Sequence, residues 1–439
     1  MHKEKIKQLI IEHRDRFLKA TELIERDIQQ VVRPLLLQRE IIVISGVRRS
    51  GKSSLLKLIS NDIRKTQQVP DKNTLYLNFD DERFIEFRHT DFELLFETYI
   101  ELFQPEGRKY FFLDEIQNIQ GWERWVNRLY EFEDVKIFIT GSNATLLSSE
   151  IASALTGRNR QILNFPFSFN EFLRFNQIEL QSEDFYLREK KVKIKNLFKE
   201  YVNVGGFPEV LKNKDLTLLE QYFKDIIYRD VIARYNIRNM YEIRELALFF
   251  ASNVGTIQSY QKLQNLINVK SLNSIKNYLT ILESVYLFTR INLFDYSVKR
   301  QIYNPSKVYA IDTALANSIA FNFSQNLGRL YENIVCIELR RQNQEFYYWK
   351  SKNNKEVDFL IKKGLRIDSA IQVCKTLSND KIQKREIEGL LEARQTLNAE
   401  QLLILTEDEE QDMIIESEKI QVIPIWKWLL EPAFFKLKG

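Results

Sequence analysis

One eight-residue segment, GVRRSGKS at residues 46–53, constrains the fold more than any other part of the chain. It matches the pattern G-x-x-x-x-G-K-[ST] at every fixed position. The preceding run EIIVIS is short, apolar and β-branched, which predicts a buried strand, and the following residues place apolar side chains at helical spacing. The chain has only 13 glycines in 439 residues, and two of them stand at the fixed positions of this pattern. The segment therefore predicts a strand, a tight loop and a helix in that order.

The loop in this segment has the composition of a phosphate-binding loop. Gly46 lets the chain turn off the strand, and Gly51 allows a positive φ, so that backbone N–H groups can approach a phosphate. We expect Lys52 to reach the β- and γ-phosphates of a nucleotide and the Ser53 hydroxyl to bind Mg²⁺. The residues expected to contact the nucleotide are Gly46, Val47, Arg48, Arg49, Ser50, Gly51, Lys52, Ser53 and Ser54. The predicted cofactors are ATP and Mg²⁺.

Two carboxylates follow the third predicted strand. Residues 109–113 run into Asp114 and Glu115, which is the Walker B arrangement. Asp114 is expected to hold Mg²⁺ through water, and Glu115 to polarise the attacking water. The alternative is an ordinary acidic pair at the start of a loop.

Two further polar positions are candidates for the same site. The fourth predicted strand ends in Ser142 and Asn143, and either side chain can sense the γ-phosphate or cap the next helix. Arg158 follows Gly157 after that helix and is expected to neutralise transition-state charge, in its own subunit or in a neighbouring one. The alternative for Arg158 is a solvated arginine after a helix C-cap glycine.

The order of the predicted elements indicates the fold class. Strands at 40–46, 74–81, 109–115, 135–143 and 160–167 alternate with helices. This alternation predicts an α/β fold with a mostly parallel sheet in the order 5-1-4-3-2. The expected domains are a P-loop ATPase core with an N-terminal helix (1–167), a helical lid (168–250), a winged-helix-like module (251–290) and a C-terminal α/β domain (291–439).

Composition excludes several classes of protein. Hydrophobic content of 44% excludes a disordered chain, and two cysteines with three histidines exclude a disulfide framework and a usual zinc site. No apolar run reaches the length of a membrane span, and the charged N-terminus lacks the apolar core of a signal peptide. A cytoplasmic protein without a membrane partner is therefore expected. The net charge of +4 is too balanced to indicate nucleic acid by itself.

Five ordered motifs carry a resemblance to a known family: GVRRSGKSSLL, YFFLDEIQNIQGWERWVNRLYE, FITGSN, LNFPFSFNEFL and YVNVGGFPEVL. Together they resemble a family of bacterial and archaeal AAA+-type ATPases in which the ATPase domain precedes a C-terminal domain of unknown function. The resemblance spans roughly residues 30–430 and implies that Arg158 is the arginine-finger or sensor candidate. GGFPE (205–209) would lie in the lid, as a hinge or as a closely packed helix–helix turn.

A local surplus of basic residues lies in the second half of the chain. Residues 259–310 hold seven basic residues against Glu283 and Asp295, namely Lys262, Lys270, Lys276, Arg290, Lys299, Arg300 and Lys307. Apolar spacing over 259–290 predicts a helix–turn–helix followed by a strand at 285–288. Double-stranded DNA is a candidate partner of this segment, and an ordinary packing module is the alternative.

The C-terminal part resembles the restriction-endonuclease-like fold. Active members of that fold use a helix Glu, a strand Asp and a Glu-x-Lys pair to bind metal and activate water. Glu332 and Asp358 match the first two, but Gln372 stands for the acid and Cys374 for the lysine. Lys375, one residue later, would face inward only through a bulge at 373–375. We therefore expect a degenerate, binding-only domain, in which Glu332 can equally be a buried charge paired with an arginine.

Three functions follow from these features. The first is an Mg²⁺-dependent AAA+-like ATPase that couples its nucleotide state to a partner, DNA or an unknown protein, held by the C-terminal half. The second is a slowly hydrolysing signalling or binding switch, and the third is an ATP-gated metal-dependent nuclease. A homo-oligomer is an open possibility because an arginine finger can serve a neighbouring subunit.

Overall fold

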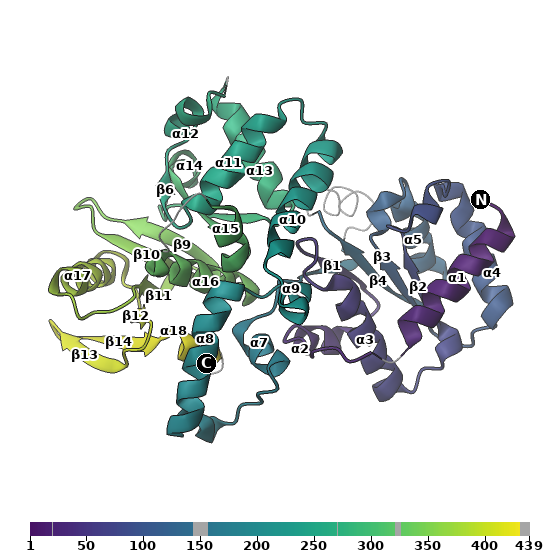
Figure 1. Cartoon of the computed structure of the whole chain (residues 1–439), viewed down its shortest axis with the longest axis horizontal. Helices are drawn as coiled ribbons and strands as arrows, with labels where there is room; N and C mark the ends of the chain where they lie inside the picture. Colours follow the sequence, from purple (N-terminus) through teal and green to yellow (C-terminus); the bar gives the residue numbers. More distant parts are fainter. Residues whose placement is uncertain (20, 144–156, 270, 321–325, 431–439) are drawn as a thin grey trace. The chain divides into compact units, whose positions relative to one another are not determined.

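The computed structural model describes residues 1–19, 21–143, 157–269, 271–320 and 326–430. The chain divides into two compact units (Figure 1). The first comprises Met1–Phe165 with Ser284–Tyr286, and the second comprises Pro166–Glu283 and Leu287–Gly439. No helix among the described residues is both long and apolar enough to cross a membrane.

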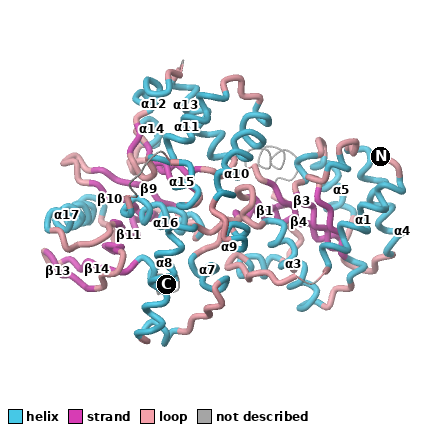
Figure 2. Tube along the Cα trace, viewed as in Figure 1, coloured by secondary structure: helices cyan, strands magenta, loops and turns pink. Residues whose placement is uncertain are grey.

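The first unit is built on a five-stranded parallel sheet (Figure 2). In spatial order its strands are β2 (Thr74–Asn78), β3 (Lys109–Asp114), β4 (Val135–Gly141), β1 (Ile41–Ser45) and β5 (Asn159–Leu163). The predicted order 5-1-4-3-2 is confirmed. Strands β1 and β4 are buried at every residue, as expected for central parallel strands covered on both faces.

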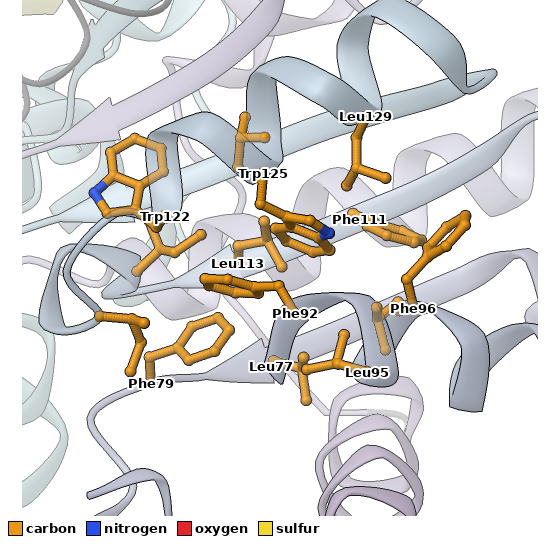
Figure 3. Close-up of a cluster of buried hydrophobic side chains, with 14 of the residues drawn as sticks. Leu77, Phe79, Phe92, Leu95, Phe96, Phe111, Leu113, Trp122, Trp125 and Leu129 are labelled. Carbon is orange, nitrogen blue, oxygen red and sulfur yellow. The ribbon is translucent and has the colours of Figure 1, made fainter. Parts of the chain in front are cut away.

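Helices cover both faces of this sheet. Helices α4 (Phe92–Phe103) and α5 (Trp122–Phe132) share one core with the strands, and α2 (Gln29–Val32) and α3 (Lys52–Gln67) contribute to the other. Figure 3 shows the first core, where Phe92 and Trp125 stack with ring centroids 4.4 Å apart over Phe111 and Leu113. The helix predicted between the fourth and fifth strands lies outside the described residues.

Helix α1 (Lys3–Leu18) lies along the edge strand β2, where Phe17 stacks on Tyr76 at a centroid distance of 4.2 Å. The sequence of residues 1–39 predicts helix that ends near Pro34, but α1 ends at Leu18 and the chain is helical again only from Gln29 to Leu35. Beyond α1 the chain turns so that Arg26 and Gln29 become buried, and the Gln29 amide donates to Asp62 of α3 at 3.0 Å. This turn places Arg26 beside the loop that follows β1.

The second unit begins with the helical region expected over 168–250. Its helices are α7 (Phe169–Phe175), α8 (Arg188–Val204), α9 (Pro208–Asn213) and α10 (Thr217–Asp225), followed by a π-helical stretch (Ile226–Ala233) and α11 (Met240–Ser252). The motifs FPFSF and GGFPE meet here, because Phe167 N–H donates to Gly206 O at 2.7 Å and Gly206 N–H to Asp312 Oδ2 at 2.7 Å. A Cβ on Gly206 would overlap the carbonyl oxygen of Phe167. The paired glycines therefore serve close packing.

A winged-helix arrangement follows. Helix α11 is succeeded by β6 (Ile257–Gln258), α12 (Tyr260–Ile267), α13 (Leu272–Ser284), β7 (Phe288–Ile291), α14 (Val298–Tyr303) and β8 (Ser306–Ala310). The three strands form an antiparallel sheet in the order β6-β8-β7. The strand expected at 285–288 lies at 288–291 instead. The arrangement runs from residue 240 to residue 310, beyond both expected ends of the module.

The C-terminal part holds a six-stranded mixed sheet in the order β13-β14-β12-β11-β10-β9. Its elements are α15 (Thr313–Ile319), α16 (Leu327–Arg341), β9 (Glu345–Lys350), β10 (Glu356–Lys363), β11 (Arg366–Val373), α17 (Asp380–Leu397), β12 (Gln401–Thr406), β13 (Gln411–Ile415), β14 (Glu418–Pro424) and α18 (Ile425–Leu430). Helix α17 packs on β10, β11 and β12, and α16 and α18 also pack on the sheet. A second sheet domain, as expected from the sequence, is therefore present.

Candidate functional site

The loop 46–51 joins the carboxyl end of β1 to the first turn of α3. Gly51 caps α3 with φ of 90°, and Arg49 also has a positive φ of 68°. A Cβ on Gly46 would overlap the carbonyl oxygen of Asn164. The loop thus has the positive φ angles and the close backbone approach that a glycine pattern of this kind predicts at the N-terminus of a helix.

Two side chains from outside the loop hold its shape, and sequence reasoning missed both. The Asn164 amide, just after β5, donates to Ser50 O at 2.9 Å and to Ser50 Oγ at 3.1 Å. The buried guanidinium of Arg26 donates to Ser50 O at 3.3 Å and to Phe165 O at 2.7 Å. Ser50 is fully buried. The motif LNFPF contained Asn164, but only its place beside the loop shows its role.

Lys52 is the first residue of α3, and its side chain is only 5% exposed. Its ammonium group donates to Gly46 O at 3.1 Å and Val47 O at 3.3 Å. It lies 3.4 Å from Glu115 Oε1. Lys52 and Glu115, both predicted to act at the nucleotide, are therefore in contact beside the loop.

Asp114 is the last residue of β3 and is completely buried. It accepts hydrogen bonds from the hydroxyls of Tyr76 (2.9 Å), Thr140 and Ser53. Burial raises the pKa of Asp114, with the neighbouring Glu115 carboxylate as a second cause. The predicted pair Ser53 and Asp114 is thus brought together, with oxygen donors of the type that Mg²⁺ prefers.

Glu115 has a positive φ of 53°, which is uncommon for a residue with a side chain. Its N–H donates to Thr140 Oγ1 at 2.9 Å, while the Thr140 hydroxyl donates to Asp114. One buried threonine on β4 therefore binds the carboxylate of Asp114 and the backbone N–H of Glu115. Thr140 was not nominated from the sequence, although it directly precedes Gly141 in the motif FITGSN.

Ser142 and Asn143 follow the end of β4 and are both buried. The Ser142 hydroxyl has no hydrogen-bond partner among the described residues. Such a buried donor next to Thr140 suits a ligand oxygen. Whether either residue caps a helix depends on residues 144–156, which lie outside the described chain.

A cavity of about 340 Å³ opens beside Ser53 and Ser54. Residues of α1, α3 and β2 line it, including Arg16, Lys57 and Asn78. It lies on the β2 side of the loop. The loop, the carboxylates and this cavity all belong to the first unit.

Arg158 lies at the other end of the sheet. It precedes β5, and its carbonyl accepts from Ile41 N–H at the first residue of β1 at 2.8 Å, whereas the loop follows the last residue of β1. The length of β1 from Ile41 to Ser45, roughly 13 Å, therefore separates the backbone of Arg158 from the start of the loop. Its guanidinium instead contacts Asn127 and lies 2.7 Å from Glu131 of α5. A role for Arg158 at the phosphate loop of its own chain does not fit this position.

The C-terminal residues singled out from the sequence are also placed. Glu332 and Asp358 both contact the ammonium group of Lys307, so Glu332 is paired with a lysine rather than with an arginine. The Gln372 amide spans Asp358 N–H and Glu356 O. Lys375 is exposed, and the register shifts of β10 lie between Val357 and Leu360 and between Ile361 and Lys362, not at 373–375.

The basic segment 259–310 is less available than its sequence suggests. Lys307 is buried, and Arg290 is half-buried and lies 3.1 Å from Glu283. Lys262, Lys299 and Arg300 are exposed. Lys276 is half-buried, with its ammonium group 5.5 Å from the ring centres of both Tyr260 and Tyr303. Lys270 lies outside the described residues.

Family models match three consecutive parts of the chain. An AAA domain matches residues 38–173, a Domain of unknown function (DUF8612) matches 195–326, and a Domain of unknown function (DUF4143) matches 327–428. Among solved structures, the Aeropyrum pernix ORC1 protein in complex with DNA is 12% identical, with 70% of this chain and 95% of that chain covered, and a TM-score of 0.30. A score this low says nothing about what the present chain binds.

Two relatives match almost end to end. An uncharacterized protein of Methanocaldococcus jannaschii is 35% identical over 430 residues, which cover 94% of this chain and 92% of the relative. An uncharacterized protein of Haemophilus influenzae is 32% identical over 400 residues, which cover 89% and 94%. The chain therefore belongs to a family of archaeal and bacterial proteins in which an AAA domain precedes domains of unknown function.

Proposed function

We propose that the chain binds ATP with Mg²⁺ at the loop 46–51 and hydrolyses it. The observation that carries this proposal is the meeting of three groups in one buried place. The Lys52 ammonium lies 3.4 Å from Glu115, and Asp114 accepts from Ser53 and Thr140 beside them. Phosphoryl transfer to water requires a cation at the phosphates, oxygen ligands for Mg²⁺ and a carboxylate that activates the water. Lys52, the pair Ser53 and Asp114, and Glu115 can supply these three functions.

Each residue has a distinct role in this proposal. Backbone N–H groups of the loop and the N-terminus of α3 bind phosphate oxygens, and Lys52 turns from the neutral carbonyls of Gly46 and Val47 to the terminal phosphates. Ser53 and Asp114 would hold Mg²⁺, which supplies charge neutralisation at the phosphates. The Glu115 carboxylate accepts a proton from the attacking water. Ser142 or Asn143 donates to a γ-phosphate oxygen.

The test is nucleotide binding and turnover of the purified chain with and without Mg²⁺. Lys52→Ala should abolish binding, whereas Lys65→Ala, the same change at an exposed position of α3, should not. Glu115→Gln should keep binding and lower turnover by about 10²-fold or more. EDTA should stop turnover and added Mg²⁺ should restore it. Wild-type turnover in Glu115→Gln would sink the assignment of this residue.

A second proposal concerns DNA. The winged-helix arrangement exposes Asn273 and Asn277 on α13 and Lys299 and Arg300 on α14, and Lys276 packs between two tyrosine rings. In winged-helix proteins the helix that corresponds to α13 can enter the major groove of duplex DNA, where polar side chains contact base edges. Basic side chains on α14, in the wing beside it, can contact the phosphates. We propose that nucleotide turnover is coupled to DNA held there.

This second proposal predicts salt-sensitive stimulation of ATP turnover by duplex DNA. Replacing Lys299 and Arg300 by alanine should weaken DNA binding and reduce the salt slope by about 1 for each phosphate that the protein no longer neutralises. The matched control replaces Lys381 and Lys384, two exposed lysines of α17. Slow turnover that no DNA changes would favour the nucleotide-dependent switch over a DNA-coupled ATPase.

Arg158 remains a candidate for action on a neighbouring subunit. In that case Arg158→Ala and Glu115→Gln should each be inactive alone. Mixing them should recover turnover, because the first keeps intact carboxylates and the second supplies the arginine. A particle mass equal to one chain in every nucleotide state, together with no recovery on mixing, would contradict this role.

A further inference from the structure

A buried lysine lies among three carboxylates in the second unit. Lys307 is in β8, and its side chain is 2% exposed. Its ammonium nitrogen is 2.8 Å from Glu332 Oε1 on α16, 2.7 Å from Glu356 Oε1 and 3.0 Å from Asp358 Oδ1, both on β10. These four residues are called the Lys307 centre below. They link the sheet of the winged-helix arrangement to the C-terminal sheet.

The carboxylates of this centre are held by the fold. The Tyr309 hydroxyl donates to Glu332 Oε1, and Val373 N–H donates to Asp358 Oδ2 at 3.0 Å. The Gln372 side chain accepts from Asp358 N–H at 3.0 Å and donates to Glu356 O at 2.7 Å, which ties β10 to β11 beside the two acids. The strand irregularity between Val357 and Leu360 falls at Asp358. The backbone of β10 and the carboxylates of Glu332 and Asp358 are thus held in place by hydrogen bonds from other parts of the fold.

The negative charges of Glu332, Glu356 and Asp358 require a cation between them. Glu332 and Asp358 are largely buried and Glu356 is 35% exposed, and three carboxylates this close repel one another unless positive charge lies between them. A hard divalent cation bound by carboxylate oxygens is one solution, and a buried ammonium with three donors is another. The ammonium group of Lys307 already meets one oxygen from each acid. In their present arrangement these three acids could not hold a metal ion, and neither could any other group of three or more His, Cys, Asp or Glu among the described residues.

We propose that Lys307 is a built-in cation that takes the place of a divalent metal in this carboxylate centre. When its ammonium group is removed, the three acids move closer together and bind a hard divalent cation such as Mn²⁺, Mg²⁺ or Ca²⁺, which their natural arrangement does not allow. In the natural chain the centre needs no metal and activates no water, so nuclease chemistry does not occur there. This inference stands independently of the proposed nucleotide site, which lies in the other unit.

The experiment measures Mn²⁺ binding to the nucleotide-free full-length chain by electron paramagnetic resonance, and its effect on the thermal midpoint. Lys307→Ala should have a lower midpoint than the natural chain, and Mn²⁺ should raise it again by several degrees, with a Kd on the order of 10–100 μM. The natural chain should show no Mn²⁺-dependent shift. Lys307→Ala combined with Asp358→Asn should bind at least ten-fold more weakly than Lys307→Ala.

A second variant keeps the proposal testable if Lys307→Ala does not fold. Lys307→Met combined with Glu332→Gln removes one charge of each sign and leaves Glu356 and Asp358 for the cation. This variant should fold and bind Mn²⁺ more tightly than the natural chain. Equal Mn²⁺ binding by the natural chain and by the folded variants would overturn the proposal. So would the absence of binding in every folded variant.

Discussion

Lys52 in the first unit and Lys307 in the second are both buried lysines beside carboxylates, yet their surroundings differ. The nearest carboxylate oxygen to Lys52 is that of Glu115 at 3.4 Å, and its hydrogen bonds go to two loop carbonyls. The Lys307 ammonium has carboxylate oxygens at 2.7, 2.8 and 3.0 Å. An ammonium has three donors, and at Lys307 all three are matched by charged acceptors.

The difference in acceptors indicates that Lys52 is available to bind a ligand, whereas Lys307 has a structural role. Phosphate oxygens are charged acceptors and can replace the neutral carbonyls that Lys52 contacts, because charge-assisted hydrogen bonds are roughly twice as strong as neutral ones. No ligand can offer Lys307 better acceptors than the three it has. Burial of a lysine near acids therefore does not identify a site by itself. The number and charge of its acceptors decide whether it is available.

The largest expected effect tests this contrast through stability. In metal-free buffer, Lys307→Ala should lower the free energy of unfolding of the second unit by about 3 kcal/mol, because it leaves the largely buried carboxylates of Glu332 and Asp358 without their cation. Lys52→Ala should cost less, about 1 kcal/mol, since two neutral carbonyls and the single carboxylate of Glu115, at 3.4 Å, lose a partner. Urea unfolding followed by circular dichroism measures both. Similar losses in the two variants would remove the distinction between the two lysines.

The next effect concerns the carboxylates at the loop. Thr140→Val keeps the shape of the side chain but removes the hydroxyl that joins Asp114 to Glu115. Turnover of ATP should fall about 10–100-fold, while ATP binding changes little, because the Asp114 carboxylate and the backbone of Glu115 each lose a hydrogen bond that holds them in place. Thr98→Val, the same change at a buried position of α4, is the control. Equal activity of the two variants would show that Thr140 does not position these acids.

Features that depend on local sequence could be predicted, whereas features that depend on contacts between distant segments could not. The fold of the first unit follows from strands and helices whose apolar patterns are local, so the sheet order and the loop at Gly46 and Gly51 were predictable. Lys52, Ser53, Asp114 and Glu115 lie within two short motifs, and they meet because both motifs follow the carboxyl ends of parallel strands.

Residues that act from a distance could not be predicted in this way. Asn164 and Arg26 support the loop through backbone contacts with Ser50, and nothing in their local sequence marks such a contact. Lys307 was counted as a basic residue for DNA, because sequence alone does not show that β8 brings it to Glu332. The helix predicted to end near Pro34 is interrupted between Leu18 and Gln29, where Arg26 is buried and donates to Ser50 O and Phe165 O, contacts that local sequence does not show.

A third effect depends on pH and concerns an acid next to the Lys307 centre. Burial, reinforced by the charge of Asp358, raises the pKa of Glu386 from its ordinary value of 4.5 to about 7. The folded state therefore holds this proton more tightly than the unfolded state, and the stability of the natural chain should fall as pH rises from about 4.5 to about 7. Glu386→Gln removes this dependence. Relative to the natural chain, the variant should gain on the order of 2 kcal/mol between pH 4.5 and pH 8.

The control for this pH effect lies on the same helix. Lys355 lowers the pKa of Glu388, so Glu388→Gln should lose stability relative to the natural chain as pH rises through the acidic range, the opposite sign. Unfolding in urea at pH values of about 3.5, 4.5, 6 and 8 gives both differences, the change in Glu388→Gln below about pH 5 and the change in Glu386→Gln above about pH 4.5. If the two variants changed in the same direction, burial at Glu386 would not be the cause.

The smallest expected effect separates two neighbouring residues of the would-be nuclease motif. Gln372 is buried and bridges Asp358 N–H to Glu356 O, so Gln372→Ala leaves buried polar groups unpaired and should cost about 1–3 kcal/mol. Lys375 is exposed beyond the end of β11, and Lys375→Ala should change stability by less than about 0.5 kcal/mol. Neither variant should alter any DNA cleavage. A cleavage activity that Lys375→Ala abolishes would require this lysine to turn inward, and the Lys307 centre would then have to give up its ammonium for a metal.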